Sequence, residues 1–537
     1  SHIAMSALNS IAFMANILNI VLATGVFTLP FSLYETGYIL GGIVLLIVAI
    51  LSFITSAFLI EAIAIANAIY KEEKQILNEV NRGRGISVSS YNSADDHIYN
   101  QDMHPTINNQ NTSASSEQGS TSGEEDEEVS DNFYIFKRYE ILKMGKSVVN
   151  KPLYIVVILF MIGYVYISIT SNAVLMGNSL ESIIIKTFSM EPNEPGEVGY
   201  LYYIVVAFYY TTIILISLRN IEELKKFTSI VMLARIIVIS LIFGSCIYVI
   251  AKYGAADISD IPSFKFSNIT LMLGNTLFYF MIQHSVPGIV EGFKPQKNLM
   301  RLLFISFLIS FVVFYIYGII TLLAFGKYTQ CDTDSGKFPT AIMNYFNLNF
   351  LHFNIIGYII NYYPLFNIIT GSIQMITCKN NFVVAISGCY PNFQHLYDEN
   401  RRAGTFKSYM LNILGSIIVC LPSIAIALTI TDIQKIMKYF TSIFGFFLML
   451  VIPMLLVYKY RERIALSDVI PGNLNKAFLS KNYWIYALSV FSLAIFVVIV
   501  INLFSTNNKI CVAEIEEQVS DIMITVKDSF SSLFLNN

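Results

Sequence analysis

The chain is poor in charged residues and in the side chains that bind metal ions or form disulfides. Only 13% of its 537 residues are charged, about half the share found in a soluble globular protein. Its six cysteines include no pair spaced by two residues, so neither a zinc site nor a disulfide framework is predicted. Lysine and arginine form no basic stripe, which argues against a nucleic-acid partner. These shortages exclude a water-soluble surface, and no cofactor or metal is expected.

Long apolar runs dominate the sequence instead. Hydrophobic residues make up 55% of the chain, and its mean hydropathy is +0.59. The runs are about twenty residues long, enough to cross a hydrocarbon core of roughly 30 Å. Each must be helical, because lipid offers the backbone no hydrogen-bonding partner. We therefore predict an all-α polytopic protein of the lipid bilayer with about eleven transmembrane helices. The runs lie at residues 9–33, 41–69, 152–183, 200–218, 228–251, 269–291, 301–325, 350–377, 408–430, 436–458 and 483–504.

Lysine and arginine set the predicted orientation. With a cytosolic N-terminus, the inner segments carry roughly three times as many basic residues as the outer ones, as the positive-inside rule requires. The C-terminus is then non-cytosolic. The predicted division is residues 1–8 as a tag remnant and short cytosolic N-terminus, 9–69 as spans one and two, 70–151 as a cytosolic loop, 152–458 as spans three to ten, 483–504 as span eleven, and 505–537 as a non-cytosolic tail.

The cytosolic loop differs in composition from the rest of the chain. Residues 85–132 are rich in Ser, Asn, Asp and Glu and include the acidic cluster 124–128. So little apolar surface cannot offset chain entropy, so the segment is predicted to be disordered. It is interpreted either as a docking segment for cytosolic regulators or as a solvated spacer. Residues 133–149 mix apolar and basic side chains, which favours a helix at the membrane surface. A disulfide between Cys331 and Cys511, both predicted outside, is left open.

The first and sixth runs contain patterns that interrupt a helix. In the first, three small residues at 23–25 lie near the middle, and Pro30 follows. A break there exposes N–H groups at the start of a second half-helix, whose dipole favours a carboxylate. The alternative is a proline-kinked span whose small residues serve packing.

In the sixth run, Gln283 and His284 adjoin Pro287 and Gly288. An ionisable residue at that depth is a functional candidate, whereas the alternative is a structural histidine that donates to a neighbouring helix. The first and sixth runs are five apart, the separation expected of two inverted five-helix repeats. Interrupted helices in matching positions of two halves indicate a transporter site.

These motifs resemble those of the amino acid/auxin permease family, within the amino acid–polyamine–organocation superfamily. In the first span the family has an Asn, a Gly-x-Gly motif, a Leu-Pro pair and a later Gly before an aromatic residue. Here Ala23 replaces the first glycine of the motif. The resemblance implies a leucine-transporter-type fold, a 5+5 inverted repeat with broken helices 1 and 6, plus an eleventh helix. The matching positions, over roughly 10–460, are Asn19, Ala23-Thr24-Gly25, Leu29-Pro30, Gly37-Tyr38, 218–224, Glu291, Lys294-Pro295, Phe325-Gly326, Tyr363-Pro364, Pro422 and Pro453.

The resemblance also implies residue roles. The backbone at the first break would hold the substrate carboxylate, and three residues of span six would face its amino group or side chain. An aromatic residue from span three and one of two tyrosines of span eight would close the site. The implied substrate-binding residues are Ala23, Thr24, Gly25, Val26, Phe280, Gln283, His284, Tyr166, and Tyr362 or Tyr363.

The coupling ion is left between two candidates. In this fold sodium lies between the broken first span and hydroxyl groups of span eight, here Thr370 and Ser372. Such hydroxyls usually bond to their own backbone instead. Protons need a titratable group, and a histidine such as His284, with an ordinary pKa of about 6.5, suits that role. We favour the proton narrowly.

A basic residue within span five is a candidate for the inner gate. Glu61 and Glu291 are both predicted near the inner face, where either would pair with Arg235. A static ion pair is one alternative to a moving gate. In the other, Arg235 snorkels to the cytosolic interface.

We therefore expect a secondary active transporter of amino acids that works by alternating access and is coupled to protons. A pocket lined by Phe280, Tyr166 and Met281, with no basic residue expected at mid-depth, favours neutral or aromatic substrates. The alternatives are a sodium-coupled symporter and a sensor that signals through the cytosolic loop. An enzyme is not expected, because no paired carboxylates, metal cluster or activated nucleophile lies at mid-depth. The plasma membrane and a vacuolar or lysosome-like membrane of a eukaryote both fit.

Overall fold

The computed structural model describes residues 2–22, 25–83, 133–190, 199–219, 221–291, 293–328, 339–389, 393, 397, 406–465 and 475–504. Within these ranges every regular element is a helix. Seven helical segments are long and apolar enough to cross a membrane, and one bent pair makes an eighth. The expected all-helical membrane protein is confirmed. The segments are α3 (Tyr38–Gly83), α7 (Lys151–Thr187), α9 (Ile221–Tyr253), α12 (Leu299–Phe325), α17 (Phe406–Thr429), the stretch from α18 (Ile433–Ile436) to α20 (Ile452–Ile464), Asn482–Phe504, and the pair α1 (His2–Val21) and α2 (Gly25–Thr36).

Shorter helices occupy the remaining predicted runs. The fourth run forms α8 (Tyr200–Ile216). The sixth run is divided into α10 (Ile269–Tyr279) and α11 (Val286–Val290), and the eighth into α14 (Asn354–Tyr362), the 3-10 turn η5 (Tyr363–Phe366) and α15 (Asn367–Cys389). Three predicted runs, the first, sixth and eighth, are therefore interrupted.

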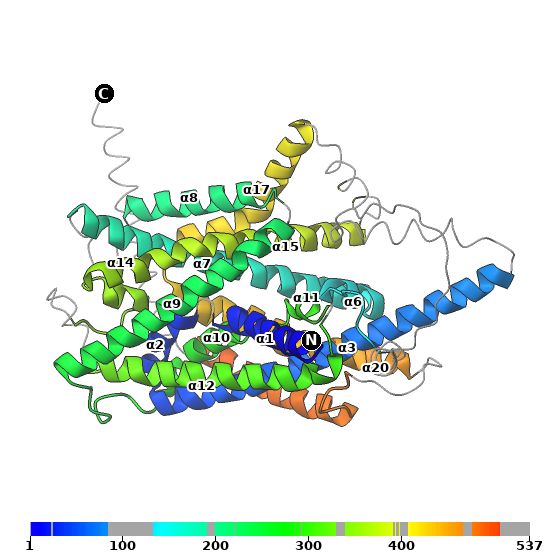
Figure 1. Cartoon of the computed structure of the whole chain (residues 1–537), viewed down its shortest axis with the longest axis horizontal. Helices are drawn as coiled ribbons and strands as arrows, with labels where there is room; N and C mark the ends of the chain where they lie inside the picture. Colours follow the sequence, from blue (N-terminus) through cyan, green and yellow to red (C-terminus); the bar gives the residue numbers. More distant parts are fainter. Residues whose placement is uncertain are drawn as a thin grey trace.

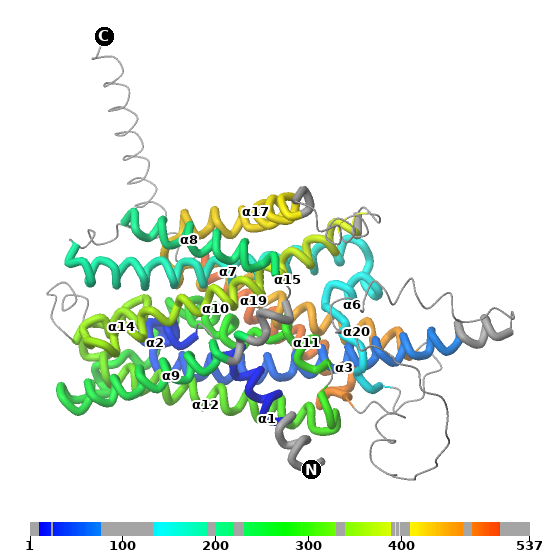
Figure 2. Tube along the Cα trace, turned by 45° about the horizontal axis from the view of Figure 1, so that its top comes forward, coloured from blue at the N-terminus to red at the C-terminus, as the bar shows by residue number. Residues whose placement is uncertain are grey.

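The helices lie side by side along the long dimension of the molecule (Figure 1). Two groups pack around the interrupted helices: α7 contacts α8, α15 and α17, while α3 contacts α10, α12 and α20. The short helix α6 (Ile141–Val148) and α20 lie toward the end from which α3 projects (Figure 2). Because the first and sixth runs break between these two groups, their breaks face the interior of the bundle.

The helix α3 is longer than the sequence predicts. It continues to Gly83, past residue 70, where a loop is expected. Its 46 residues span about 69 Å at 1.5 Å per residue, more than twice the hydrocarbon core. The segment beyond residue 70 is rich in Lys and Glu, which have high helix propensity, so the helix continues past the apolar run.

Residues 133–149 also differ from the expected surface helix. Only α6 is helical, and the segment before it is irregular and anchored by two buried side chains, with Phe133 4% and Ile135 0% exposed. The amide of Gln296 both donates to and accepts from the backbone of Ile135, at 2.8 and 3.0 Å. The amide of Asn67, in α3, bonds the backbone of Phe136 and Lys137 in the same way. The side-chain amides of Gln296 and Asn67 thus take the place of a sheet or helix as hydrogen-bond partners of this backbone, and they fix it against the bundle.

Candidate functional site at the broken helices

The first run breaks where small residues were expected to break it. The axes of the helical segments before and after residues 22–24 differ by 54°. Inside α2, Pro30 has no N–H to offer the carbonyl of Val26 four residues earlier. The hydroxyl of Tyr317, from α12, donates to that carbonyl instead at 2.7 Å. The half-helix then ends at Gly37, which has φ of +93° and so a conformation that favours glycine.

The sixth run breaks at residues 280–285 and is supported from α3. The hydroxyl of Ser52 donates to the carbonyl of Phe280 at 2.7 Å, just past the last turn of α10. The amide nitrogen of Gln283 reaches the hydroxyls of Ser52, Thr55 and Ser56 at 3.1–3.3 Å. The side-chain oxygen of Gln283 accepts from the backbone N–H of Ile282. Gln283, predicted to face the substrate, therefore bonds a backbone group freed by the break and anchors the break to α3.

A buried polar network joins α2 of the first run to α10 of the sixth. Thr28 of α2 shares a 2.8 Å hydrogen bond with Tyr279 of α10, and the Tyr279 hydroxyl donates to Asn275 at 2.9 Å. The amide of Gln434, from α18, accepts from Asn275 at 3.0 Å and donates to the carbonyl of Thr28 at 3.3 Å. The four side chains are at most 4% exposed. The half-helices α2 and α10 are thus bonded to one another and to the start of the tenth predicted run.

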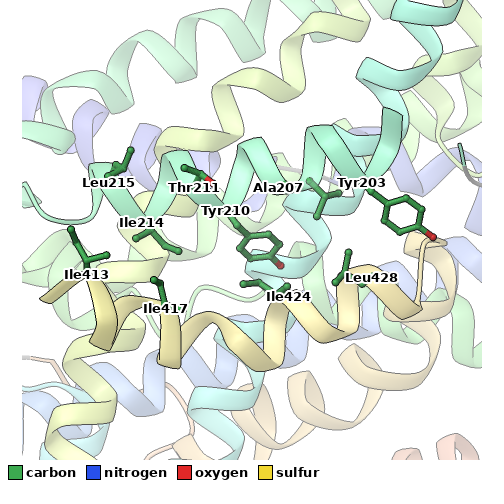
Figure 3. A pocket seen from close by; sticks show the side chains of 11 residues that line it. Tyr203, Ala207, Tyr210, Thr211, Ile214, Leu215, Ile413, Ile417, Ile424 and Leu428 are labelled. Carbon is green, nitrogen blue, oxygen red and sulfur yellow. The ribbon is translucent and has the colours of Figure 1, made fainter. Parts of the chain in front are cut away.

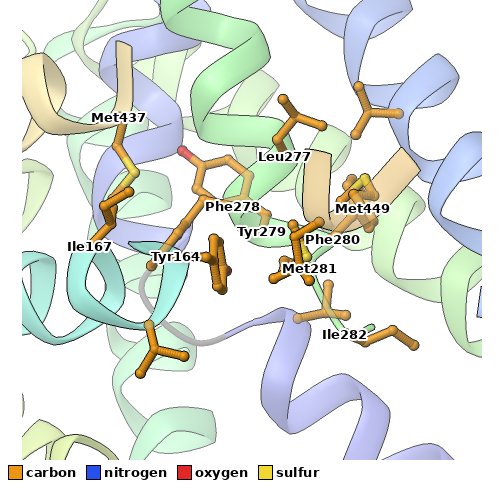
Figure 4. Packing of buried hydrophobic residues seen from close by; sticks show 14 of the residues in the cluster. Tyr164, Ile167, Leu277, Phe278, Tyr279, Phe280, Met281, Ile282, Met437 and Met449 are labelled. Atoms are coloured by element: carbon orange, nitrogen blue, oxygen red, sulfur yellow. The ribbon is translucent and has the colours of Figure 1, made fainter. Parts of the chain in front are cut away.

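His284 lies beside the break with an unsatisfied nitrogen. Its Nδ1 is buried and meets no hydrogen-bond partner among the described residues. The Tyr164 ring of α7 lies 5.7 Å from the imidazole and 6.2 Å from the ring of Phe278. Figure 4 shows Tyr164 directed toward Phe278, with Tyr279, Phe280 and Met281 following along the chain. A buried imidazole nitrogen without a partner is costly and is available to a ligand or a proton.

The other predicted aromatic residues differ in where they point. Tyr166, expected to cover the ligand, has its hydroxyl beside the thiols of Cys378 and Cys420, on the side of α7 that faces α15 and α17. Tyr164 takes the position expected of Tyr166. Phe280 is fully buried against Phe307 and Phe314 of α12.

The two tyrosines of the eighth run differ in burial and in their neighbours. Tyr362 is 42% exposed and stacks on Tyr358. Tyr363 is 2% exposed, and its ring lies 5.6 Å from Phe27 of α2. Of the pair, Tyr363 is therefore the residue at the broken first run.

Arg235 does not snorkel to an interface and does not pair with Glu61 or Glu291. It is 5% exposed, and its Nε donates to the Tyr363 hydroxyl at 2.8 Å. Its Nη1 donates to Asn19, both to the backbone carbonyl and to the side-chain oxygen. Asn19 lies in the last turn of α1, so Arg235 is next to the first break. The prediction that no basic residue lies at mid-depth is therefore wrong.

Glu61 is paired instead with Arg461 of α20. The two side chains form a bidentate ion pair with N–O distances of 2.9 and 2.8 Å and are 4% and 9% exposed. The carboxylate also accepts from the backbone N–H of Ala477 at 3.0 Å. Glu291 follows α11 as its C-terminal cap residue. The predicted inner gate of Arg235 with these two carboxylates is therefore not formed.

The remaining predicted positions are placed as follows. The Ser372 hydroxyl donates to the carbonyl of Ile368 in its own helix at 2.7 Å, as helix hydroxyls commonly do. Thr370, two residues earlier in α15, is half-buried. Ala23, Thr24, Cys331, Cys511 and residues 85–132 lie outside the described residues. Among the residues described, no cluster of three His, Cys, Asp or Glu side chains could hold a metal ion.

A separate groove lies on the outside of the bundle. It has a volume of about 400 Å³ and runs between α8 and α17 (Figure 3). Its lining is almost entirely apolar and includes none of the predicted site residues. The lining residues are Tyr203, Val206, Ala207, Tyr210, Thr211, Ile214, Leu215, Ile413, Ile417, Ile424 and Leu428. Such a surface fits the acyl chains of the surrounding bilayer.

Asp432, immediately before the span that begins at Ile433, carries a pH-dependent prediction. Its carboxylate caps α18 by accepting from the N–H of Gln434 at 2.9 Å, and burial raises its pKa above the ordinary 3.8. The folded state then holds the proton more tightly than the unfolded chain, so this carboxyl lowers stability as pH rises above 3.8. Asparagine caps a helix equally well without the charge.

We expect Asp432→Asn to raise the melting temperature in detergent at neutral pH. The gain should shrink toward zero as the pH is lowered, because the aspartate then becomes protonated in the wild type. Thermal unfolding of both proteins across a pH series measures this difference. A gain that stays constant with pH would show that the charge of Asp432 is not its cause.

Comparison with known proteins identifies the family. The family described as transmembrane amino acid transporter protein matches residues 8–77 and 136–505, leaving out the stretch that contains the acidic segment. A transmembrane protein 104 homolog from Dictyostelium discoideum is 24% identical over 87% of this chain and 91% of its own length. Transmembrane protein 104 is 21% identical in Mus musculus, over 84% of this chain and 87% of its own, and 20% in Homo sapiens, over 92% and 96%. The chain belongs to the transmembrane amino acid transporter protein family, as its resemblance to amino acid permeases predicts.

Proposed function

We propose that this protein is a secondary active transporter of amino acids that alternates access to a site between its two broken helices. The observation that carries the proposal is the pairing of the breaks: α2 and α10 pack together in a chain of this family. The start of α2 presents backbone N–H groups, which favour a substrate carboxylate. Gly25 and Val26, which begin α2, are the described residues placed to do this.

The proposed architecture is eleven spans, ten of them in two inverted repeats of five, with a cytosolic N-terminus and a non-cytosolic C-terminus. Interruptions in the first and sixth runs, five apart, support it. The inner side is then the end of the bundle that carries α6 and the ion pair of Glu61 with Arg461. The outer network of Thr28, Tyr279 and Gln434 closes the opposite side of the breaks.

The proposed substrates are neutral or aromatic amino acids, and the coupling ion is the proton. Tyr164, Phe278 and Met281 surround the break of the sixth run with apolar surface. The positive charge of Arg235 is turned to Asn19 and Tyr363, so it gives no reason to expect an acidic substrate. His284, with a buried and unpartnered nitrogen, is the proposed proton carrier.

The test is uptake of labelled neutral and aromatic amino acids into proteoliposomes under a pH gradient and, separately, under a sodium gradient. Accumulation driven by the pH gradient is expected, and His284→Ala should reduce it to the level seen without a gradient. His352→Ala, which removes an exposed histidine that is in neither the first nor the sixth run, is the matched control and should leave uptake unchanged. Binding of amino acids without flux under either gradient would favour a sensor over a transporter.

A further inference from the structure

The positive charge of Arg235 lies at the carbonyl end of a half-helix. The last four carbonyls of a helix lack partners within it and form the negative end of its dipole. α1 ends at Val21, so the carbonyl of Asn19 belongs to this set. Arg235 reaches it from α9, a separate helix, and donates as well to the side-chain oxygen of the same residue at 2.5 Å.

Within the part of the chain that the structure describes, no carboxylate balances this charge. Arg235 is 5% exposed, and among the described residues it forms no ion pair. Its partners are a carbonyl, an amide oxygen and the hydroxyl of Tyr363. A buried cation is costly unless its surroundings compensate it. Here the compensation comes from neutral oxygen atoms and the helix dipole, which together form the kind of environment that binds an alkali cation in broken-helix transporters.

The partners of Arg235 also come from elements at the breaks. Asn19 lies before the break of the first run, and Tyr363 lies in η5, which interrupts the eighth run. Its side chain therefore joins α1, α9 and η5. The sodium position expected from the sequence lies between the same two runs, the first and the eighth, but its candidate hydroxyl Ser372 is bonded to its own helix.

We propose that the guanidinium of Arg235 permanently takes the place of a coupling sodium ion at the carbonyl end of α1. Arginine keeps its charge in proteins, so a covalently attached cation occupies the oxygen atoms that sodium would need. A second cation there would be repelled at short range. Transport then requires no sodium, and removing the charge of Arg235 opens a position that sodium can fill. This inference deepens the proposed transporter function and rests on it.

The test uses binding and stability, which do not depend on transport activity. The full chain is purified in detergent, and its melting temperature is measured in sodium chloride and in choline chloride at equal concentration, together with binding of ²²Na⁺. The wild type should melt at the same temperature in both salts and bind no saturable sodium. Arg235→Ala should gain saturable ²²Na⁺ binding and a higher melting temperature in sodium.

Three further variants sharpen the result. Arg235→Lys keeps the charge and should behave like the wild type in both salts. Arg301→Ala removes an exposed arginine at the start of α12 and should gain no sodium binding. If Arg235→Ala does not fold, Arg235→Gln, which keeps a donor without the charge, replaces it.

Saturable sodium binding by the wild type would overturn the inference, as would a folded Arg235→Ala or Arg235→Gln that binds none. Failure of the proposed function itself would be seen separately, as absence of uptake by a wild type that nonetheless shows these binding properties.

Discussion

Replacing either partner of the Glu61–Arg461 ion pair is expected to lower the free energy of unfolding by about 3–5 kcal/mol, because each replacement leaves one buried charge uncompensated. Both side chains are less than 10% exposed, at 4% and 9%. Glu61→Gln keeps the shape and still accepts from the N–H of Ala477, so its effect reports the lost charge. Arg461→Met keeps much of the apolar length of the side chain against the ring of Phe58.

The double variant separates the cost of an unpaired charge from the value of the pair. Glu61→Gln with Arg461→Met removes both charges together and should be markedly more stable than the sum of the single effects predicts. Glu462→Gln on the same helix is the matched control, since its pair with Lys459 is exposed and such surface pairs contribute little to stability. Thermal unfolding in detergent compares the four variants with the wild type. Equal effects of Glu61→Gln and Glu462→Gln would show that burial gives the Glu61–Arg461 pair no special weight.

The interruptions of the first and sixth runs could be predicted from the sequence because their causes are local. Proline removes a specific N–H, and Pro30 and Pro287 each follow a break, at 22–24 and at 280–285. The breaks therefore lie within the stretches that the sequence marks, although neighbouring helices support them. Hydropathy likewise predicts the helices, because lipid leaves the backbone no other solution.

The direction of a side chain around a span could not be predicted in the same way. Tyr164 and Tyr166 are two positions apart, about 200° around a helix, and only one faces the break. In a soluble helix, the polar face would tell them apart. The third run is apolar on nearly all sides, so composition gives no preferred face. The exchange of Tyr166 for Tyr164, and the choice of Tyr363 over Tyr362, required the packing of neighbouring helices.

The long-range partners of polar side chains also could not be predicted from the sequence. Arg235 bonds a residue 216 positions away, and Glu61 bonds one 400 positions away. The sequence shows that a buried charge needs compensation, but several carboxylates and oxygens meet that need equally well. Gln434 and Asn275 were missed for this reason, although a buried amide near the start of a span is a signal worth following.

Any side chain added at Gly25 is expected to disrupt the first break and to destabilise the protein. A Cβ at Gly25 would lie 2.7 Å from Cδ1 and 3.0 Å from Cγ of Tyr279, and 3.1 Å from the ring of Phe314. The Tyr279 ring cannot yield freely, because its hydroxyl is bonded to Thr28 and Asn275. Overpacking of this kind costs about 1–3 kcal/mol, so Gly25→Ala should be destabilised by that amount and Gly25→Val by more.

Gly244→Ala, in α9, provides the control for Gly25→Ala. A Cβ there meets nothing within 4 Å, and alanine in place of a helical glycine should stabilise the protein by about 1 kcal/mol or less.

If the clash with Tyr279 is the cause, the costs of Gly25→Ala and Tyr279→Ala will be less than additive, because the second change removes the ring that the first one meets. Melting temperatures of the single and double variants decide this. Strict additivity, or a Gly25→Ala protein as stable as Gly244→Ala, would mean that the close approach of α2 to α10 does not depend on the absence of a side chain at Gly25. Amino acid uptake by Gly25→Ala should fall together with its stability, since the same glycine begins the half-helix whose N–H groups are proposed to hold the substrate carboxylate.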